Sequence, residues 1–351
     1  MNNKMEFLAG NEKRFADFIS NLNERDKIAI LSHNDRDGIC SAVIVSKSIG
    51  NPDYVGIIPL DLFNLPEIIS ELKKKKINKI IICDLAIFDS KELLKKLEEF
   101  AELLVIDHHP FMEDLNSERI TYLKADTHYP AAYICYYLFS KIKEIPEIFG
   151  VLGTLCDTDY KYNENNAETI YDDYGFKSKK QNLWEIARNL TYAIIYFKDS
   201  NPKKVYDILM GDNYLENLKK LEKYSKIILD EIESHTKDFE KNHDEYKDLI
   251  LYLYKPKFSF ASILSTIISL RDFSKTIILA YEKEGRIRMS CRRQDGKVDC
   301  NRLMRLSVEG IPDSKAGGHF KASGGDIPKE SFEKFKENLF RVYDSLKDNL
   351  K

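Results

Sequence analysis

Short apolar runs alternate with amphipathic stretches along the first 160 residues of the chain. The runs over 27–31, 79–82 and 103–106 are rich in Ile, Leu and Val, which is typical of strands buried on both faces of a parallel sheet. A shorter strand is expected over 54–58. The spacing of apolar positions predicts helices over 12–23, 39–49, 65–75, 90–100, 131–142 and 148–157. This alternation predicts an α/β domain with a mostly parallel, doubly wound sheet.

The pattern changes after residue 201. Residues 213–244 are rich in Lys, Glu and Leu and contain neither Gly nor Pro, which predicts one long helix that connects two domains. Strands over 249–254, 276–281 and 286–292, a helix over 260–270 and a final helix from Lys329 predict a second, smaller α/β domain. We therefore expect a first domain over 1–200, a helical connector over 201–245 and a second domain over 246–351.

Side chains that commonly bind metals follow the predicted strands. His33, Asp35 and Asp37 follow the first strand at alternate positions, so extended backbone would place them on one face. The groups that follow the next two strands and the helix over 148–157 are Asp84, then Asp107, His108 and His109, and finally Asp157. The ends of neighbouring parallel strands meet at one edge of a sheet, where ligands usually bind. Imidazole and carboxylate ligands suit a hard or borderline divalent cation such as Mn²⁺.

Each of these residues taken alone has a simpler interpretation. Asp35 or Asp37 would serve as the N-cap of the next helix, and a lone Asp or His at a strand end is often a cap or a satisfied core group. We expect Asp159 to be solvated or capping, and Gly38 to allow a tight turn before the helix over 39–49. Three strand ends that all carry such residues are harder to explain as caps, because a doubly wound sheet brings them together.

The overall composition limits the kinds of function. The 351 residues include 43% hydrophobic residues, enough for a sizeable core, and a net charge of -3 with a pI of about 6.2 gives no overall nucleic-acid-binding signature. Any nucleic-acid contact must be local. We find no secretory segment and no apolar run that could span a bilayer, so we expect a cytoplasmic protein without membrane contact. The six cysteines form no CxxC pair, which predicts reduced, mostly buried thiols.

A local group of basic residues lies in the second domain. It comprises Arg286, Arg288, Arg292, Arg293, Lys297, Arg302 and Arg305. The arginines at alternate positions of 286–292 would share one strand face, which can hold phosphates through charge-assisted hydrogen bonds; the alternative is an exposed strand with arginines for solubility. Four aromatic residues are expected in the core, with base stacking as the alternative. They are Tyr252, Tyr254, Phe258 and Phe260. The lysines of 73–76 are expected at a solvated helix end, with phosphate contact as the alternative.

These motifs in order resemble the DHH phosphoesterase superfamily. His33-x-Asp35-x-Asp37-Gly38 is similar to its first motif, Asp84 to the second, Asp107-His108-His109 to the third and Asp157 to the fourth. Gly317-Gly318-His319-x-x-Ala322-x-Gly324 resembles the companion module called DHHA1. The branch that this combination resembles is that of the RecJ-like and nanoRNase-like nucleases.

The chain departs from the family pattern at three places. Ala316 stands where many relatives have Gly, and Ser323 stands where Ala is common. The segment Tyr129-Pro130-Ala131-Ala132 lacks a Ser that many relatives carry. The first two departures concern fine substrate specificity and not the metal site, and because of the third, any role of that hydroxyl is not transferred to this chain.

The resemblance implies two divalent metal ions, with Mn²⁺ preferred and Mg²⁺ as the alternative. It assigns His33 and Asp35 to the first ion and Asp84 to a bridging position. The ligands of the second ion would be Asp37, His108 and Asp157. His109 would contact the phosphate, with Asp107 orienting the site. The residues that would hold the substrate are Arg292, Gly317, Gly318 and His319. Arg292 is set apart from the other arginines, which are expected to serve solubility, because Ser290-x-Arg292 resembles the family's phosphate-binding position.

The expected activity is that of a metal-dependent phosphodiesterase, with substrate held in a cleft between the two domains. The favoured substrates are ends of single-stranded DNA or RNA, or short oligonucleotides, from which water activated by two metals would release mononucleotides. Alternatives are a small-molecule phosphoesterase acting on cyclic dinucleotides, nanoRNA or a bisphosphorylated nucleotide, an inorganic pyrophosphatase, and a replication or repair scaffold. Replication or repair proteins and a second copy of the chain are left open as partners. We expect no room for an additional OB-type domain.

Overall fold

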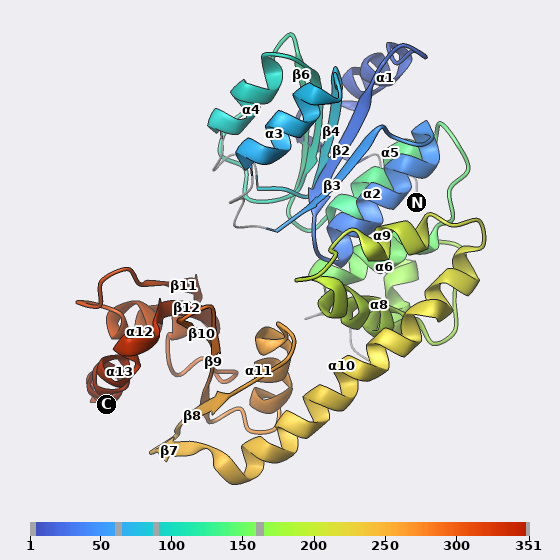
Figure 1. Cartoon of the computed structure of the whole chain (residues 1–351). Helices are drawn as coiled ribbons and strands as arrows, with labels where there is room; N and C mark the ends of the chain where they lie inside the picture. The colour runs from blue at the N-terminus through green and yellow to red at the C-terminus, as the bar shows by residue number, and fades with distance from the viewer. Residues whose placement is uncertain (1–4, 60–64, 87–90, 159–164, 349–351) are drawn as a thin grey trace. The chain divides into compact units, whose positions relative to one another are not determined.

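The computed structural model describes residues 5–59, 65–86, 91–158 and 165–348 (Figure 1). The chain divides into two compact units, Met1–Lys226 and Ile227–Lys351. Their boundary falls inside helix α10 (Tyr214–Asn242), which is the long helix predicted over 213–244. It lies within the connector that was predicted over 201–245. Across the described ranges, no helix combines the length and apolar character that crossing a bilayer requires.

A six-stranded sheet forms the centre of the first unit, in the order β1-β6-β5-β4-β2-β3. All neighbouring strands run parallel except β1, which pairs antiparallel with β6. The strands are β1 (Phe7–Ala9), β2 (Ile28–His33), β3 (Tyr54–Ile58), β4 (Lys79–Cys83), β5 (Glu102–Asp107) and β6 (Ile120–Ala125). The predicted mostly parallel sheet is confirmed.

Helices cover both faces of this sheet (Figure 1). Helices α3 and α4 pack on one face and α2 and α5 on the other, where α6 packs against α2 and α5. The helices are α1 (Glu12–Ser20), α2 (Arg36–Ile49), α3 (Leu65–Lys74), α4 (Lys91–Glu98), α5 (Ala131–Phe139), α6 (Ile148–Asp157), α7 (Ile170–Tyr174), α8 (Leu183–Phe197) and α9 (Lys204–Leu209). The sheet is therefore doubly wound, as predicted.

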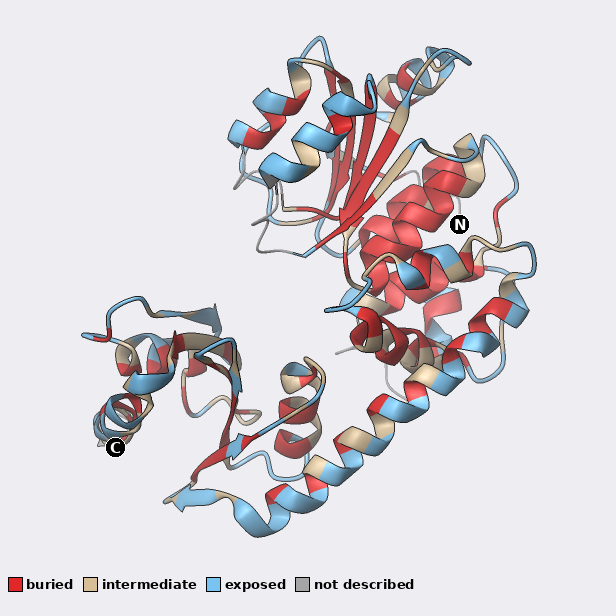
Figure 2. Ribbon diagram, in the orientation of Figure 1, coloured by how far each residue is buried: buried red, intermediate tan, exposed pale blue. Residues whose placement is uncertain are grey.

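Successive residues of the central strands enter two different cores. Ile30 and Ile81 pack with α2, α5 and α6, whereas their neighbours Leu31 and Ile82 pack with α3 and α4. None of the four is more than 1% exposed, and Figure 2 shows the middle of the sheet as buried. Because both faces are covered, these strands need apolar residues at every position, which is why they appear in the sequence as continuous apolar runs.

The second unit contains another six-stranded sheet, in the order β11-β12-β10-β9-β8-β7. Among these described strands, only β8 and β9 pair in parallel. The strands are β7 (Asp244–Tyr246), β8 (Leu249–Tyr254), β9 (Thr276–Lys283), β10 (Arg286–Arg292), β11 (Lys315–His319) and β12 (Ala322–Pro328). Helices α12 (Cys300–Ser307) and α13 (Phe332–Asp348) cover one face, and α11 (Ala261–Ser269) packs against β9 and β10. The predicted smaller α/β domain is confirmed.

Some predicted details differ from the structure. Strands β6, β11 and β12 and the helices α7, α8, α9 and α12 were not predicted. The helix expected over 131–142 ends at Phe139, with Ser140 as its C-cap, and the Ile142 N–H bonds to the Phe139 carbonyl three residues back. Tyr252, Tyr254 and Phe260 are at most 4% exposed. They belong to the core, which removes the base-stacking alternative for these three.

Candidate metal centre

The carboxyl end of β2 runs directly into helix α2. His33 is the last residue of β2, and Asp35 caps α2 by accepting a hydrogen bond from the Gly38 N–H at 2.9 Å. The predicted helix start at Ile39 is wrong, because α2 begins at Arg36 and Gly38 lies in its first turn. Gly38 is needed for close approach: a Cβ there would lie 2.3 Å from the His33 carbonyl oxygen. The cap interpretation therefore holds for Asp35, whose second carboxylate oxygen contacts His33 at 2.9 Å.

Asp37 lies in the first turn of α2 and is fully buried. Its two carboxylate oxygens accept hydrogen bonds from the Ala131 and Ala132 N–H groups at 2.8 and 2.7 Å. These groups begin α5, whose own N-cap residue, Pro130, supplies no side-chain cap. Asp37 thus satisfies amides that would otherwise be orphaned at a helix start, where negative charge is also favoured by the helix dipole.

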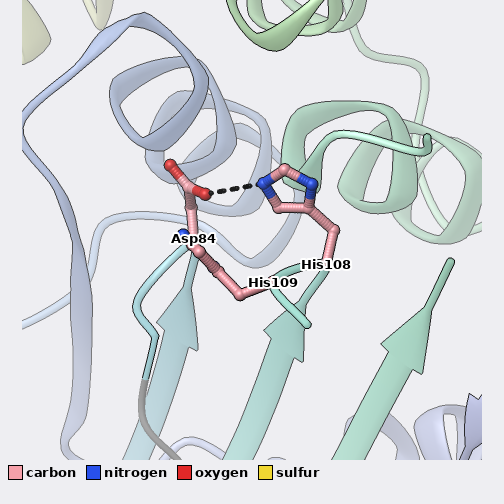
Figure 3. A group of neighbouring side chains, drawn as sticks. All are labelled: Asp84, His108 and His109. Atoms are coloured by element: carbon pink, nitrogen blue, oxygen red, sulfur yellow. Dashed lines mark ion pairs between the residues drawn. The ribbon is translucent and has the colours of Figure 1, made fainter. Parts of the chain in front are cut away.

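Asp84 follows β4 directly, with its side chain directed toward His108 (Figure 3). It is 2% exposed, and its backbone has φ of 57°, in the left-handed region that few residues other than glycine adopt. Such a conformation costs roughly 1–3 kcal/mol and is found mainly at functional sites. The Asp84 N–H donates to the Ile106 carbonyl at 3.1 Å, which holds this backbone against β5.

His108 follows β5 and faces the carboxylates through its Nε2 atom. Its Nδ1 lies 3.3 Å from the Thr127 carbonyl oxygen, which can only accept a hydrogen bond. That contact favours a proton on Nδ1 and leaves Nε2 as the electron-pair donor in a neutral ring. Nε2 lies 3.0 Å from Asp157, 3.3 Å from Asp84 and 3.7 Å from Asp37.

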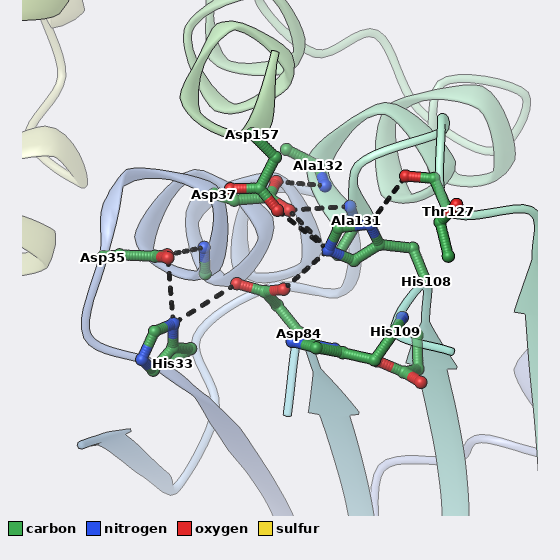
Figure 4. Close-up of polar contacts among 12 residues, drawn as sticks. His33, Asp35, Asp37, Asp84, His108, His109, Thr127, Ala131, Ala132 and Asp157 are labelled. Carbon is green, nitrogen blue, oxygen red and sulfur yellow. Dashed lines mark hydrogen bonds and ion pairs between the residues drawn. The ribbon is translucent and has the colours of Figure 1, made fainter. Parts of the chain in front are cut away.

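The predicted ligands come together in two groups that share Asp84 (Figure 4). One group is His33, Asp35 and Asp84, and the other is Asp37, Asp84, His108 and Asp157; within each, one donor atom per residue lies within 4.8 Å of all the others. Asp84 Oδ2 lies 3.7 Å from His33 Nδ1, while its Oδ1 lies 3.3 Å from His108 Nε2. The two oxygens of one carboxylate therefore face different groups.

The chemistry of these donors fits divalent cations. All are carboxylate oxygens or imidazole nitrogens, the ligands that Mn²⁺ and Mg²⁺ sites use. Asp84 Oδ2 and His108 Nε2 are buried and make no hydrogen bond to any residue that the structure describes. Buried polar atoms are normally hydrogen-bonded, so such atoms indicate a partner that is not a protein group.

The histidines of this centre hold protons tightly in the protein alone. Burial lowers the pKa of His33, but the nearby carboxylates of Asp35 and Asp84 outweigh it and raise the pKa to about 10. The same balance, with Asp157 and Asp84 as partners, raises the pKa of His108 to about 11. Burial and the charge of Asp35 raise the pKa of Asp84. Cations entering the site would have to displace these protons.

Helix α6 delivers Asp157 at its last residue, and the side chain is 36% exposed. Cys156 precedes it and is only partly buried, unlike the other five cysteines. Its sulfur forms a third donor group with Asp35 and Asp157, and a fourth group contains Asp84, His108 and His109; within each, one donor atom per residue lies within 4.8 Å of the others. The prediction of reduced, mostly buried thiols missed the place of Cys156 beside the carboxylates. Asp159 lies outside the described residues.

Two buried basic residues near this centre were also missed. Arg36 donates to the Ala187 carbonyl at 3.2 Å and to the Thr191 hydroxyl at 2.8 Å, which ties the start of α2 to α8. Lys124 pairs with Asp107 at the end of β5. The sequence does hold one indication of Lys124. Residues 120–123 are followed directly by this charged residue, just as charged residues or histidines follow the strands that were predicted.

The strand register of the second unit places predicted substrate-binding residues on one face. Arg292 lies opposite Ala322, which lies opposite His319. By the same ladder Ser290 lies opposite Gly324, which lies opposite Gly317, and directly opposite residues share a face. This is the face that α11 covers, since Arg292 donates to Ser262 at 2.9 Å and Ser290 contacts Ser265 at 2.9 Å.

The glycines of β11 have different surroundings. A Cβ at Gly317 would meet no described atom within 4 Å, so its backbone is open on that side. Gly318 has φ of 151°, and a Cβ there would lie 2.5 Å from the Ala322 carbonyl oxygen. Only glycine fits at this second position. His319 beside them is exposed.

The predicted basic group is partly neutralised by carboxylates. Arg286 pairs with Asp313 at 2.8 Å and also with Asp326, which Arg288 contacts at 3.5 Å. Arg293 is 2% exposed and pairs with Asp248 at 2.9 Å and Asp295 at 2.7 Å. The inclusion of Arg293 in the basic group was wrong, because this side chain is buried. The carboxylates beside Arg286 and Arg288 also leave β10 with less net positive charge than its arginines alone suggested.

The fold and the side chains at its strand ends define an α/β protein with a candidate centre for two divalent cations. Residues 27–156 match the model of the DHH family, N-terminal domain, and residues 259–344 match the DHHA1 domain. The chain belongs to the DHH family and carries a DHHA1 domain, as the motifs predicted. A comparison with curated proteins found no match.

Solved structures share this fold. RecJ from Thermus thermophilus in complex with Mn²⁺ has a TM-score of 0.68 and 15% identity, over 97% of this chain and 56% of that chain. Exonuclease RecJ bound to manganese has the same score and identity, over 97% and 94%. CDC45 from Entamoeba histolytica has a TM-score of 0.53 and 11% identity, over 95% and 98%. The chain combines the DHH and DHHA1 domains in a RecJ-like fold, and it spans about half the length of the Thermus RecJ.

Proposed function

We propose that the chain is a phosphodiesterase that uses two divalent ions, Mn²⁺ in preference to Mg²⁺, to release mononucleotides from the ends of single-stranded nucleic acid. The observation that carries the proposal is the pair of donor groups that share Asp84. One carboxylate facing two groups is the arrangement that a bridging ligand requires. Similar RecJ structures hold Mn²⁺ or Mg²⁺, which supports a divalent ion of this kind, and the preference for Mn²⁺ is part of the proposal.

The first ion would be held by His33, Asp35 and Asp84. The second would be held by Asp84 together with Asp37, His108 and Asp157. When bound, two such ions supply an activated water and neutralise charge on the phosphate. The chain's own part is to hold the imidazoles in the correct orientation, as the Thr127 carbonyl does for the His108 ring.

His109 would act on the phosphate rather than on a metal. Its Nδ1 lies 2.7 Å from Asp107 Oδ1, so the proton shared there fixes the ring and leaves Nε2 for the substrate. The His109 side chain is 27% exposed, while Asp107 is 2% exposed. His109 can therefore reach a substrate from solvent, while the buried Asp107 orients its ring.

The second unit would bind substrate phosphates through Arg292, the Gly317 and Gly318 backbone and His319. We expect Arg292→Ala and His319→Ala to raise KM for oligonucleotides about 10-fold or more, because a hydrogen bond to a charged group contributes about 1.5–3 kcal/mol. Their effect on kcat should be smaller if the contacts are equally strong in the ground and transition states. The measurement is steady-state kinetics with a single-stranded oligonucleotide.

Arg286→Ala is the matched control for this experiment. Arg286 lies on the same face of β10 but is paired with Asp313 and Asp326, so its loss should leave KM unchanged. Equal falls in kcat and kcat/KM for Arg292→Ala would contradict a pure binding role and place the guanidinium in the transition state.

The length of the bound strand should be short. Because Arg286, Arg288 and Arg293 are paired with carboxylates, these three add little free charge for phosphates beyond the first few nucleotides. We expect affinity to level off at short oligonucleotides and duplexes to be resisted. The test is a ladder of single strands at fixed salt, with kcat/KM measured on the native protein and Kd on the inactive Asp84→Asn variant. Affinity that climbs steeply over long strands would contradict the proposal.

The same paired arginines favour a second candidate, a phosphoesterase for small substrates. Cyclic dinucleotides, nanoRNA and a bisphosphorylated nucleotide belong in the same assay, and a kcat/KM for one of them well above that of every strand in the ladder would replace the exonuclease proposal. End-labelled DNA and RNA strands with Mn²⁺ would report the polarity and the preferred sugar from product lengths. A scaffold role, the remaining alternative, predicts no hydrolysis of any of these substrates.

A further inference from the structure

A lysine with no exposed surface lies behind the Asp107-His108-His109 motif. Lys124 belongs to β6 and stands directly opposite Asp107 in the parallel pairing of β5 and β6. Its Nζ lies 2.9 Å from Asp107 Oδ2. Asp107 Oδ1 contacts the His109 ring Nδ1 at 2.7 Å and the His109 N–H at 3.3 Å. One buried carboxylate is thus divided between a buried ammonium and an imidazole that reaches solvent.

This pairing fixes the carboxylate in two directions. With Oδ2 held by Lys124, the plane of the Asp107 carboxylate is set, and Oδ1 points to the His109 ring. Burying a lysine and an aspartate costs more in desolvation than a packed apolar pair would. A pair of this kind is therefore weak as a device for stability, and its geometry points to orientation of the third group, His109.

Loss of the ammonium would leave the carboxylate with another buried neighbour. Tyr122 is two residues before Lys124 and therefore on the same face of β6. Burial and the charge of Asp107 raise the pKa of Tyr122, in agreement with a hydroxyl close to that carboxylate. Without Lys124, Asp107 would be free to turn toward the Tyr122 hydroxyl, and the His109 ring would lose its fixed direction.

We propose that Lys124 is a positioning residue for hydrolysis, which acts by holding Asp107 so that His109 presents Nε2 to the phosphate. The inference rests on the proposed function, because it gives His109 a role at the substrate. It adds a fourth strand end, that of β6, to those that build the active site.

The first test is a double-mutant cycle between Lys124→Met and His109→Ala. We expect Lys124→Met to lower kcat by about 10–100-fold, the usual range for loss of an outer-shell partner, with KM and Mn²⁺ affinity unchanged. In the His109→Ala background the same substitution should cause no further loss, because its effect passes through the missing ring. Loss of activity that adds in full to that of His109→Ala, or an unchanged kcat, would overturn the proposal.

Lys79→Met is the matched control. Lys79 is a buried lysine at the opposite end of the same sheet, 2.6 Å from Glu102, and is 6% exposed. Its substitution should change the melting temperature without changing kcat. If Lys124→Met fails to fold, Lys124→Leu, which is also uncharged and has no hydrogen-bond donor, takes its place in the cycle with the same expectations.

A second readout does not depend on activity. The proton shared by His109 Nδ1 and Asp107 should give a downfield resonance in the proton NMR spectrum of the native protein, identified by its absence in His109→Ala. Lys124→Met should abolish or shift this resonance, and Lys79→Met should preserve it. A resonance unchanged by Lys124→Met would overturn the inference. A native protein that shows the resonance but hydrolyses no phosphodiester would refute the proposed function alone.

Discussion

Asp84→Asn should abolish phosphodiester hydrolysis while the protein remains folded. Asp84 faces both donor groups, and a neutral amide cannot compensate the charge of two cations, so the loss should exceed the roughly 100-fold that removing an outer-shell partner costs. The backbone at this position has φ of 57°, a region that Asn adopts as readily as Asp. The substitution therefore changes charge with little effect on conformation. The measurements are kcat/KM with Mn²⁺ and thermal unfolding.

The neighbouring residue supplies the control for this variant. Cys83 is fully buried and packs against Cys135, with the two sulfur atoms 3.8 Å apart. Cys83→Ser should be mild in activity, because this side chain has no part in either donor group. Activity of Asp84→Asn near that of the native protein would end the two-metal assignment, and unfolding of the variant would move the test to Mn²⁺ titration of Asp35→Asn.

The affinity for Mn²⁺ should rise steeply with pH. The pKa values of about 10 for His33 and about 11 for His108 lie above their usual value, so both rings are protonated near neutral pH in the metal-free protein. Each ring must lose its proton to bind a cation. Affinity should therefore increase by up to about tenfold per pH unit for each proton displaced, until the pH reaches these raised pKa values.

Calorimetric titration with Mn²⁺ measures this exchange directly. Heats of binding recorded at one pH in two buffers with different ionisation enthalpies give the number of protons released. We expect a release of one to two protons per protein at pH 7.5. Binding constants that do not change between pH 6.5 and 8.5, with no proton released, would show that the imidazoles are not ligands. His243→Gln, in the second unit and outside both donor groups, is the control.

The position of the centre could be predicted because strands and ligands are linked in sequence. Ile80 and Ile82 form part of a run that must be a buried strand, and Asp84 follows it at once. The topology of a parallel sheet then brings such residues together without any knowledge of the loops. The division into two donor groups was not determined by spacing, since it depends on how Asp84 turns at its unusual φ.

Residues whose partners are distant in sequence could not be predicted. Arg293 is paired with Asp248, which lies 45 residues earlier on the chain, as well as with the nearby Asp295. Lys124 was missed because β6 was not predicted, and its partner is Asp107, 17 residues away. In neither case does the pattern of apolar and polar residues along the chain show which side chain is the partner.

The choice of an inactive variant for trapping a complex follows from the surroundings of Asp37. That carboxylate holds the first two amides of α5, so neutralising it would loosen a helix as well as empty a ligand position. A variant at Asp37 would therefore be inactive for two reasons at once, a lost ligand and a disturbed helix. Asp84 caps no helix in the described part of the chain, so its replacement should abolish hydrolysis without disturbing a helix. Substrate soaked into Asp84→Asn crystals would therefore be seen in a framework that is otherwise native.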